Sequence, residues 1–293
     1  MSRIAYVNGA YRPLPHAAVH VEDRGYQFAD GVYEVVYRHN GRLVDTDLHL
    51  ARLARSLREL AIRPPVSNAA LLAILAEVAR QNRLATGLLY IQITRGTAPR
   101  WHAFPPPGTP PSLVVTMRRA APFPTSLATW HTKAITLPDQ RWARCDIKSI
   151  SLLPNALAKQ TAREAGAGEA IFYDSTNIIT EGASTSVFIV DAEGTLRTRP
   201  LSHAILPGCT RAALIEDLKA AGIPYEERAF TLEELESASE IFITAATTFV
   251  KPITHLNGTQ VGTGTPGPIA TRLFALVSAH VTGQRNVGVG GLG

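Results

Sequence analysis

Hydrophobic positions along this chain follow two rhythms, one typical of strands and one typical of helices. Short apolar runs are joined by Asn-Gly pairs at residues 8–9, 40–41 and 257–258. Because Asn-Gly is the preferred two-residue turn of a β-hairpin, we expect a strand on each side of every pair. Three such turns predict antiparallel pairing rather than a purely parallel sheet.

Other segments repeat their apolar residues at intervals of three and four, which is the pattern of one helix face. The first runs from Leu50 to Ala61 and has candidate caps at 45–47; the second starts at the good capping pair 67–68 and ends near Leu84. Further helices are expected over 152–165, 210–222, 232–237 and 269–281. Further strands are expected over LLYIQITR, SLVVTM, 127–137, 170–173, 186–190, 225–230 and 240–244.

A Pro-containing segment, RRAAPFPTS at 118–126, separates two regions that each mix strands and helices. Chains beyond roughly 250 residues usually divide into two domains. The predicted fold class is therefore α+β or mixed α/β with two domains. We expect a small N-terminal α/β domain over 1–119, a linker over 120–125, a larger C-terminal domain over 126–282 and a flexible tail over 283–293.

Composition and charge exclude several classes of protein. The chain is 45% apolar and 18% charged, which excludes disorder as its main state. Its net charge of +5 is scattered and forms no basic stripe for nucleic acid. Two cysteines without a CxxC pattern indicate neither a disulfide framework nor a metal site. The start does not resemble a signal peptide, and no apolar run is long enough for a membrane span. We expect a cytoplasmic protein without nucleic-acid or membrane partners.

Lysine is rare in this chain, and one lysine has an unusual setting. Only five of the 29 basic residues are lysines. Lys148 lies in CDIKSISLLPNALAK, where the end of a strand passes through a polar turn into a helix. An amine near a domain junction can lose its charge by desolvation and become a nucleophile. An ordinary surface lysine is the alternative that this pattern leaves open.

A second candidate is Glu181 in ITEGASTSVFIV, between two apolar strands. The small residues that follow it, 182–185, form a turn of the kind that presents backbone N–H groups to anions. A carboxylate within such a core needs a cationic partner. A plain turn at the end of a strand remains the alternative.

Several segments offer ligands for a phosphate. In ILPGCTRAALIEDL, Gly208, Cys209 and Thr210 lead directly into a helix, so its first amides and the threonine hydroxyl suit a phosphate; a simple threonine cap is equally consistent. Arg52 stands among apolar helix positions, which favours a phosphate ligand over a solvated arginine. The segment TAATT at 244–248 adds hydroxyl groups after a strand.

Arg100 and His102 are two residues apart in the loop RGTAPRWH. Two donors at this spacing can clamp a carboxylate, although such pairs are common on surface loops. A reactive amine, a buried carboxylate, phosphate donors and a carboxylate clamp are together the requirements for binding pyridoxal phosphate and an amino acid.

The order and spacing of these motifs resemble the fold type IV pyridoxal-phosphate aminotransferases, and within them most closely the D-amino acid aminotransferases. The resemblance extends from YVNG to about His280. It rests on the motifs DRGYQFADGVYEVV, HLARL, ITRGTAPRWH, DIKSISLLPNALAKQ, TEGASTSVF, LPGCTR and FITAATT.

The resemblance implies a role for each site residue. Lys148 would form the Schiff base and move protons, and Glu181 would pair with the pyridine nitrogen. Tyr33 would lie beside the substrate carboxylate, which Arg100 and His102 would hold from the other subunit. The remaining residues would contact the cofactor: Arg52, the Cys209 amide, Thr210 and Thr247 at the phosphate, Leu206 against the ring, and Ser184 and Thr185 on the outer side.

The resemblance also implies a homodimer with a barrel-like core in the larger domain and the cofactor between the domains. Its substrates would be D-amino acids and 2-oxo acids, such as D-alanine and 2-oxoglutarate. Trp101, between Arg100 and His102, is bulky and departs from the family's pattern in the substrate pocket. Other activities on this scaffold stay open: branched-chain L-amino acid transaminase, (R)-amine transaminase and aminodeoxychorismate lyase. A non-catalytic ligand-binding module is the alternative from a different class.

Overall fold

The computed structural model describes residues 3–283, so the predicted tail lies almost wholly outside the described residues. Contacts within the chain define two compact units. Unit 1 contains the residues up to Phe123 together with 142–153 and 202–207, and unit 2 contains the rest. The chain first passes from unit 1 to unit 2 between Phe123 and Pro124, inside the predicted linker. The domain bounds deduced from the sequence remain a prediction.

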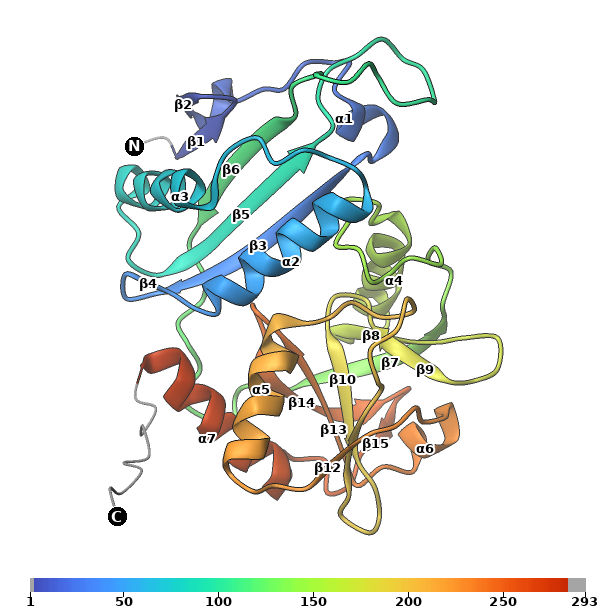
Figure 1. Ribbon diagram of the computed structural model, residues 1–293. Coiled ribbons are helices and arrows are strands. Elements are labelled where there is room, and N and C mark those ends of the chain that lie inside the picture. Colours follow the sequence, from blue (N-terminus) through green and yellow to red (C-terminus); the bar gives the residue numbers. More distant parts are fainter. Residues whose placement is uncertain (1–2, 284–293) are drawn as a thin grey trace, which may run out of the picture. The chain divides into compact units, whose positions relative to one another are not determined.

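Within the described residues, unit 1 is built on a six-stranded sheet of order β2-β1-β6-β5-β3-β4 (Figure 1). Its strands are β1 (Ile4–Val7), β2 (Ala10–Pro13), β3 (Gly31–His39), β4 (Arg42–Leu43), β5 (Gly87–Thr94) and β6 (Ser112–Arg118). Its helices are the short 3-10 helix η1 (Leu14–His16), α1 (Arg24–Phe28), α2 (Thr46–Glu59) and α3 (Asn68–Asn82). Every strand pair in this sheet is antiparallel, as the Asn-Gly pattern predicts.

The apolar faces of α2 and α3 pack on this sheet. Leu53 and Leu57 of α2 and Leu75 of α3 lie in one buried cluster with Leu89 and Ile91 of β5. The helix periodicity in the sequence is therefore confirmed, and so is the predicted cap of α3, where the Ser67 hydroxyl accepts a hydrogen bond from the Ala70 amide.

The three Asn-Gly pairs form the predicted turns. Asn8, Asn40 and Asn257 have φ values of 47°, 47° and 51°, and the glycine after each also has a positive φ. Two successive residues with positive φ define the type I′ turn that joins strands of right-handed twist. The first two pairs connect β1 to β2 and β3 to β4, and the third connects β14 to β15 in unit 2.

Unit 2 is built, among the residues described, on a nine-stranded mixed sheet of order β12-β11-β10-β13-β14-β7-β8-β9, with β15 paired to β14. The strands are β7 (Thr132–Pro138), β8 (Glu169–Tyr173), β9 (Ile179–Gly182), β10 (Ser186–Val190), β11 (Leu196–Thr198), β12 (Tyr225–Glu227), β13 (Glu240–Ala245), β14 (Phe249–Leu256) and β15 (Thr259–Gln260). The helices are α4 (Leu153–Glu164), α5 (Cys209–Ala220), α6 (Leu232–Glu236) and α7 (Pro268–Thr282).

This sheet curves into a half-barrel around a buried apolar cluster (Figure 1). Ile171 of β8, Ile189 of β10, Ile243 of β13 and Ile253 of β14 all contribute to that cluster. The predicted class, a mixed α/β fold in two parts with a barrel-like core in the larger one, is confirmed. The strand predicted over 127–137 is shorter than expected and begins only at Thr132. Across the described part of the chain, no helix combines the length and the apolar character needed to cross a membrane.

Candidate active site

Lys148 lies in unit 1, in an irregular segment held against the end of β3. Its carbonyl oxygen accepts a hydrogen bond from the Tyr33 amide at 3.0 Å, and its amide donates to the Ser56 hydroxyl at 3.2 Å. The Lys148 Nζ atom lies 4.2 Å from the centre of the Tyr33 ring. The structure therefore brings together two of the residues that the resemblance places at the reaction.

Arg52 is buried and does not stand alone. Its guanidinium donates two hydrogen bonds to the Glu34 carboxylate, at 2.8 and 2.9 Å, and His49 donates a third through Nδ1 at 2.7 Å. Burial raises the pKa of Glu34, but the charge and hydrogen bonds of Arg52, the hydrogen bond of His49 and the charge of Lys148 outweigh it. The pKa of Glu34 is thereby lowered to about 2, so this residue is a carboxylate at neutral pH.

The charges in this cluster do not balance. Arg52 and Lys148 carry two positive charges and Glu34 carries one negative charge. Arg52 also donates to the Pro207 carbonyl at 3.0 Å, next to Leu206, so helix α2 and the segment 202–207 meet at its guanidinium. A net positive group of this kind suits a phosphate, the ligand expected for Arg52.

Arg100 and His102 lie in the exposed loop between β5 and β6, also in unit 1. The Arg100 guanidinium carbon is 5.1 Å from the centre of the Phe28 ring, and the His102 ring centre is 5.5 Å from it. Both members of the predicted clamp thus contact one aromatic residue of α1. The side chain of Trp101 between them is 71% exposed.

Glu181 is buried on β9 of unit 2 and has the cationic partner that its burial requires. Arg141 donates from Nη1 to Glu181 Oε1 at 2.5 Å and also binds both carboxylate oxygens of Asp139. Burial raises the pKa of Asp139, but Arg141 and the Thr180 hydroxyl lower it further than burial raises it. Because two carboxylates share one arginine, these three side chains carry a net charge of −1. A protonated ring nitrogen is a suitable partner for that charge.

The turn after Glu181 differs from the prediction in one respect. The Gly182 amide donates to the Thr185 carbonyl and the Ala183 amide donates to the Ala170 carbonyl, so these two N–H groups are not offered to an anion. The hydroxyls of Ser184 and Thr185 both donate to the buried carboxylate of Glu169, at 3.1 Å each. The turn is anchored from within unit 2, which the sequence pattern did not indicate.

Glu169 also holds Lys159 of α4. The Lys159 Nζ atom lies 3.2 Å from Glu169 Oε1 and donates to the Gly168 carbonyl. Lys159 is therefore held in an ion pair, whereas the Nζ atom of Lys148 contacts the Tyr33 ring.

Helix α5 begins at the predicted phosphate segment. Its N-cap is Gly208, so the alternative of a threonine cap is wrong: Thr210 is the second residue of the helix. Cys209 and Thr210 are both buried, and the Thr210 hydroxyl makes no hydrogen bond to any other described residue. No side chain of the described residues caps this helix start, and the Thr210 hydroxyl lies in its first turn. Thr247 lies exposed in the turn between β13 and β14, near the Thr248 hydroxyl.

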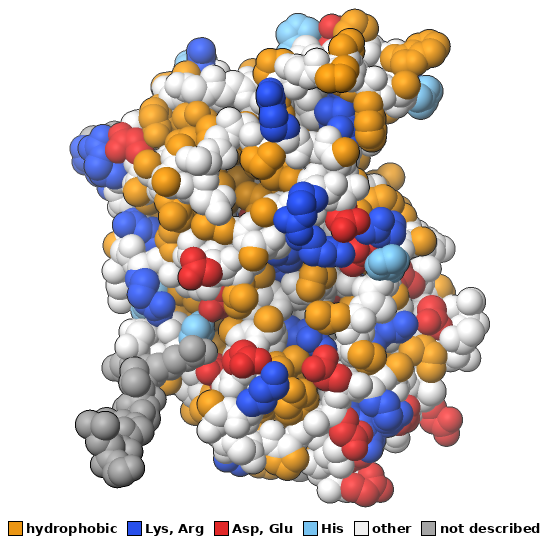
Figure 2. Space-filling view, viewed as in Figure 1, with side chains coloured by type: hydrophobic (Ala, Val, Ile, Leu, Met, Phe, Trp, Pro, Cys, Tyr) orange, Lys and Arg blue, Asp and Glu red, His pale blue; other side chains and the backbone are white. Residues whose placement is uncertain are grey.

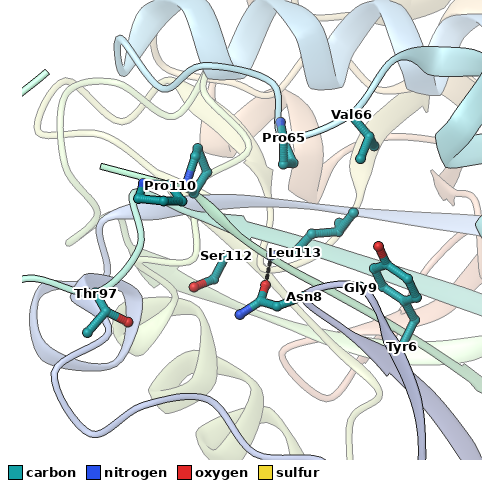
Figure 3. Close-up of a pocket in the computed structure, with 10 residues that line it drawn as sticks. Tyr6, Asn8, Gly9, Pro65, Val66, Thr97, Pro110, Ser112 and Leu113 are labelled. Atoms are coloured by element: carbon teal, nitrogen blue, oxygen red, sulfur yellow. Dashed lines mark hydrogen bonds between the residues drawn. The ribbon is translucent and has the colours of Figure 1, made fainter. Parts of the chain in front are cut away.

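A cavity of about 450 Å³ lies elsewhere in unit 1 and contains none of the predicted site residues. Figure 3 shows Asn8 and Gly9 of the first hairpin turn on one side and Pro65 and Val66 on another. Thr97 and Pro110–Ser112, the two ends of the loop that carries Arg100, complete its wall. The cavity has no lysine, carboxylate or arginine in its lining, so it does not have the chemistry of the candidate site.

Comparison with known proteins places this geometry in a family. A model of the family described as Amino-transferase class IV matches residues 31–256, which include Lys148 and Glu181. The chain belongs to the class IV aminotransferases. The resemblance seen in the sequence is thereby confirmed, together with its cofactor, pyridoxal 5′-phosphate.

Relatives of this class IV aminotransferase match along most of its length. It is 41% identical over 262 residues to a D-alanine aminotransferase of Bacillus licheniformis, covering 89% of this chain and 91% of the relative. It is 40% identical over 258 residues to a D-alanine aminotransferase of Listeria innocua, covering 88% of this chain and 89% of the relative. Among solved structures, the branched-chain amino acid aminotransferase of Escherichia coli is similar with a TM-score of 0.88 at 24% identity, covering 99% of this chain and 98% of that one.

Each unit of this aminotransferase carries residues whose chemistry suits a part of the cofactor. Unit 1 supplies the amine of Lys148 and a net positive cluster at Arg52. Unit 2 supplies a net negative cluster at Glu181 and an uncapped helix start with a hydroxyl at Thr210. Glu34, His49, Arg141 and Asp139 were missed by sequence reasoning. A buried arginine and a buried carboxylate each require a partner, and that requirement is the signal which points to them.

Proposed function

We propose that this enzyme transfers amino groups between D-amino acids and 2-oxo acids, for example from D-alanine to 2-oxoglutarate. The observation that carries the proposal is the Arg100–His102 pair, which an exposed loop presents beside Phe28. A guanidinium and an imidazole make a carboxylate site that a neutral pocket cannot imitate. The relatives named D-alanine aminotransferase, at 36–41% identity over 88% or more of the chain, support it.

Lys148 is the proposed catalytic amine. When bound, pyridoxal phosphate supplies an aldehyde that takes up an amino group and a ring that stabilises the electron pair left by the α-proton. In this proposal the Nζ atom of Lys148 holds the cofactor covalently at rest and moves the α-proton during the reaction. Tyr33 supports this role, because its ring faces Nζ at 4.2 Å and its amide fixes the lysine backbone.

Glu181 is proposed to bind the protonated ring nitrogen. Its cluster with Arg141 and Asp139 has one negative charge in excess, which the ring cation balances. Arg141 already donates to one oxygen of this carboxylate, and the proposal assigns the N–H of the ring as a second donor to Glu181.

The phosphate is proposed to bind Arg52, the Cys209 amide, Thr210 and Thr247. The net positive cluster around Arg52 and the uncapped start of α5 both favour a dianion. Leu206, next to the Pro207 carbonyl that Arg52 binds, is proposed to pack on the ring. Ser184 and Thr185 are proposed to lie on the outer side of the cofactor, with their hydroxyls bound to Glu169.

We propose further that the enzyme is a cytoplasmic homodimer and that Arg100 and His102 act in the site of the partner copy. Four large apolar side chains around the clamp are more than 60% exposed: Val21, Tyr26, Trp101 and Phe104. Figure 2 shows hydrophobic side chains on the surface around α1 and the loop after β5. Exposed apolar patches of this kind mark interaction surfaces. Two buried free cysteines fit a reducing compartment.

The test is a product analysis. The purified enzyme with its cofactor is incubated with pyruvate and either D-glutamate or L-glutamate, and the alanine formed is resolved on a chiral column. We expect D-alanine from D-glutamate and almost no alanine from L-glutamate. L-Alanine as the main product, or efficient transfer from L-leucine, would instead support the branched-chain alternative.

A further inference from the structure

Arg24 connects helix α1 to the loop that carries Arg100 and His102. It is 3% exposed. Its Nη1 donates to the Trp101 carbonyl at 2.6 Å and to the Ala103 carbonyl at 3.3 Å, and its Nη2 donates to the His102 carbonyl at 3.3 Å. One guanidinium therefore binds three successive backbone carbonyls at the tip of the loop.

The guanidinium of Arg24 is itself held in place. Its Nε donates to Asp30 Oδ2 at 2.8 Å, and its carbon lies 4.7 Å from the centre of the Phe28 ring. Asp30 is fixed in turn by Arg95, which binds both of its oxygens and donates to the carbonyls of Leu60 and Ala61 at the end of α2. The anchor of the loop thus extends back into the sheet and helices of unit 1.

The base of the loop is also tied to this region. The Arg24 amide donates to the Gly96 carbonyl at 2.9 Å, and Asp23 and Thr97 form an isolated antiparallel bridge. Beyond the base, Arg100 and His102 are exposed side chains, and their packing partner is Phe28. The conformation of the tip therefore depends on Arg24, because an exposed loop without such contacts would sample many conformations.

We propose that Arg24, held by Asp30, is a positioning residue that fixes the substrate-carboxylate clamp of Arg100 and His102. This inference rests on the proposed function, since the clamp is part of it. Arg24 acts on the backbone of residues 101–103, so the two clamp side chains start from one defined backbone conformation. A pre-organised clamp loses less conformational entropy when it binds the carboxylate. Arg24 is thereby a determinant of affinity for substrates that carry an α-carboxylate.

Three side chains of unit 1 allow a sharp test. Arg24→Lys keeps the positive charge beside Asp30, but a lysine cannot span three carbonyls. Arg38→Met is the matched control: Arg38 also joins two backbone carbonyls, those of Gly41 and Leu84, at the opposite end of β3. Arg100→Ala removes the clamp itself. Half-reactions with D-alanine are measured for these variants and for the double variant Arg24→Lys/Arg100→Ala, each loaded with cofactor.

We expect Arg24→Lys to raise the half-saturating D-alanine concentration roughly tenfold while the limiting rate changes less, as for a loss of binding common to ground and transition states. Arg38→Met leaves both values near those of the wild type. In the Arg100→Ala background, Arg24→Lys raises the half-saturating D-alanine concentration by less than about twofold. The reason is that the effects of residues that act through one contact are not additive. The cofactor absorbance band is the same in all variants.

Different failures have different meanings. Arg24 has no role through the clamp if Arg24→Lys leaves the half-saturating D-alanine concentration unchanged. The same conclusion follows if Arg24→Lys raises this concentration by the same factor in the presence and in the absence of Arg100. If the Arg100→Ala variant itself handles D-alanine like the wild type, the clamp of the proposed function is wrong and this inference falls with it.

Discussion

The Lys148 Nζ atom faces the Tyr33 ring at 4.2 Å, and a hydrogen bond from the Tyr33 amide to the Lys148 carbonyl ties the two backbones together. This pairing joins the end of β3 to a segment more than a hundred residues later in the chain. It gives a flexible amine a defined position, which a catalytic lysine requires.

Lys148→Ala is expected to abolish the covalent link to the cofactor and nearly all transamination. The check is borohydride reduction of the holoenzyme, followed by identification of the labelled peptide. Lys219→Ala is the control, because Lys219 is an exposed lysine paired with Glu216 on α5, and it should keep the label. A label on any lysine other than Lys148 would show that the assignment is wrong.

Glu34→Gln tests the buried cluster around Arg52. The pKa of Glu34 is lowered from 4.5 to about 2, so its ionised form stabilises the fold above pH 4.5, and that contribution is lost as the pH falls toward 2. The shift corresponds to on the order of 3 kcal/mol. We expect the variant to lose roughly 2–4 kcal/mol of unfolding free energy at neutral pH, with a difference from the wild type that shrinks as the pH falls through this window.

Glu77→Gln provides the contrast for that experiment. The pKa of Glu77 is also lowered to about 2, by hydrogen bonds from Arg80 and Gln81, but this group is on the surface of α3, where solvent screens the pair. Urea unfolding at several pH values should show little effect of this variant. If Glu34→Gln and Glu77→Gln lost the same unfolding free energy, burial of the Glu34 cluster would not contribute to its effect on stability.

Arg141→Met leaves Glu181 and Asp139 close together without their shared cation. Removing one partner of a buried ion pair typically costs about 3–5 kcal/mol, so a loss of that size is expected in denaturant unfolding. Arg141→Lys should recover part of it, since a lysine restores the charge but not the fork of hydrogen bonds. Wild-type stability in the methionine variant would contradict the role given to Arg141.

Glu181→Gln should keep the cofactor but slow removal of the α-proton strongly. A neutral amide does not hold a proton on the ring nitrogen, so the ring becomes a weaker electron acceptor. Single-turnover rates with α-deuterated and ordinary D-alanine measure this step directly, and the isotope effect should rise in the variant. Unchanged single-turnover rates would remove Glu181 from the mechanism.

Local signals predicted much of the fold. The Asn-Gly turns and the helix from Ser67 were predictable because the decisive contacts lie within a few residues of each other. Helix α1 was missed because its five residues are too few to show a helical period. Strand β14 was expected only as the strand before the turn at 257–258, and its length was not predicted because Pro252, which cannot donate a strand hydrogen bond, stands in its middle.

The site was predictable at its reactive groups but not at their partners. Lys148 and Glu181 stand in distinctive local motifs. Their supporting residues are distant in sequence: Arg141 is 40 residues from Glu181, and Glu34 is 18 residues from Arg52. Only the folded chain shows which of many charged residues fills each requirement. For Glu34 the pattern DGVYEVV is that of an ordinary strand and gives no sign that its glutamate faces a buried arginine.

The most direct test of the central claim is the rate at which single amino acids convert the bound cofactor to its amine form, followed by absorbance. D-Alanine or D-glutamate should react far faster than its L-enantiomer, and Arg100→Ala should narrow that difference by slowing the D-substrate roughly tenfold to a hundredfold. Faster reaction of L-leucine or L-valine than of any D-amino acid would contradict the account and assign the enzyme to the branched-chain group.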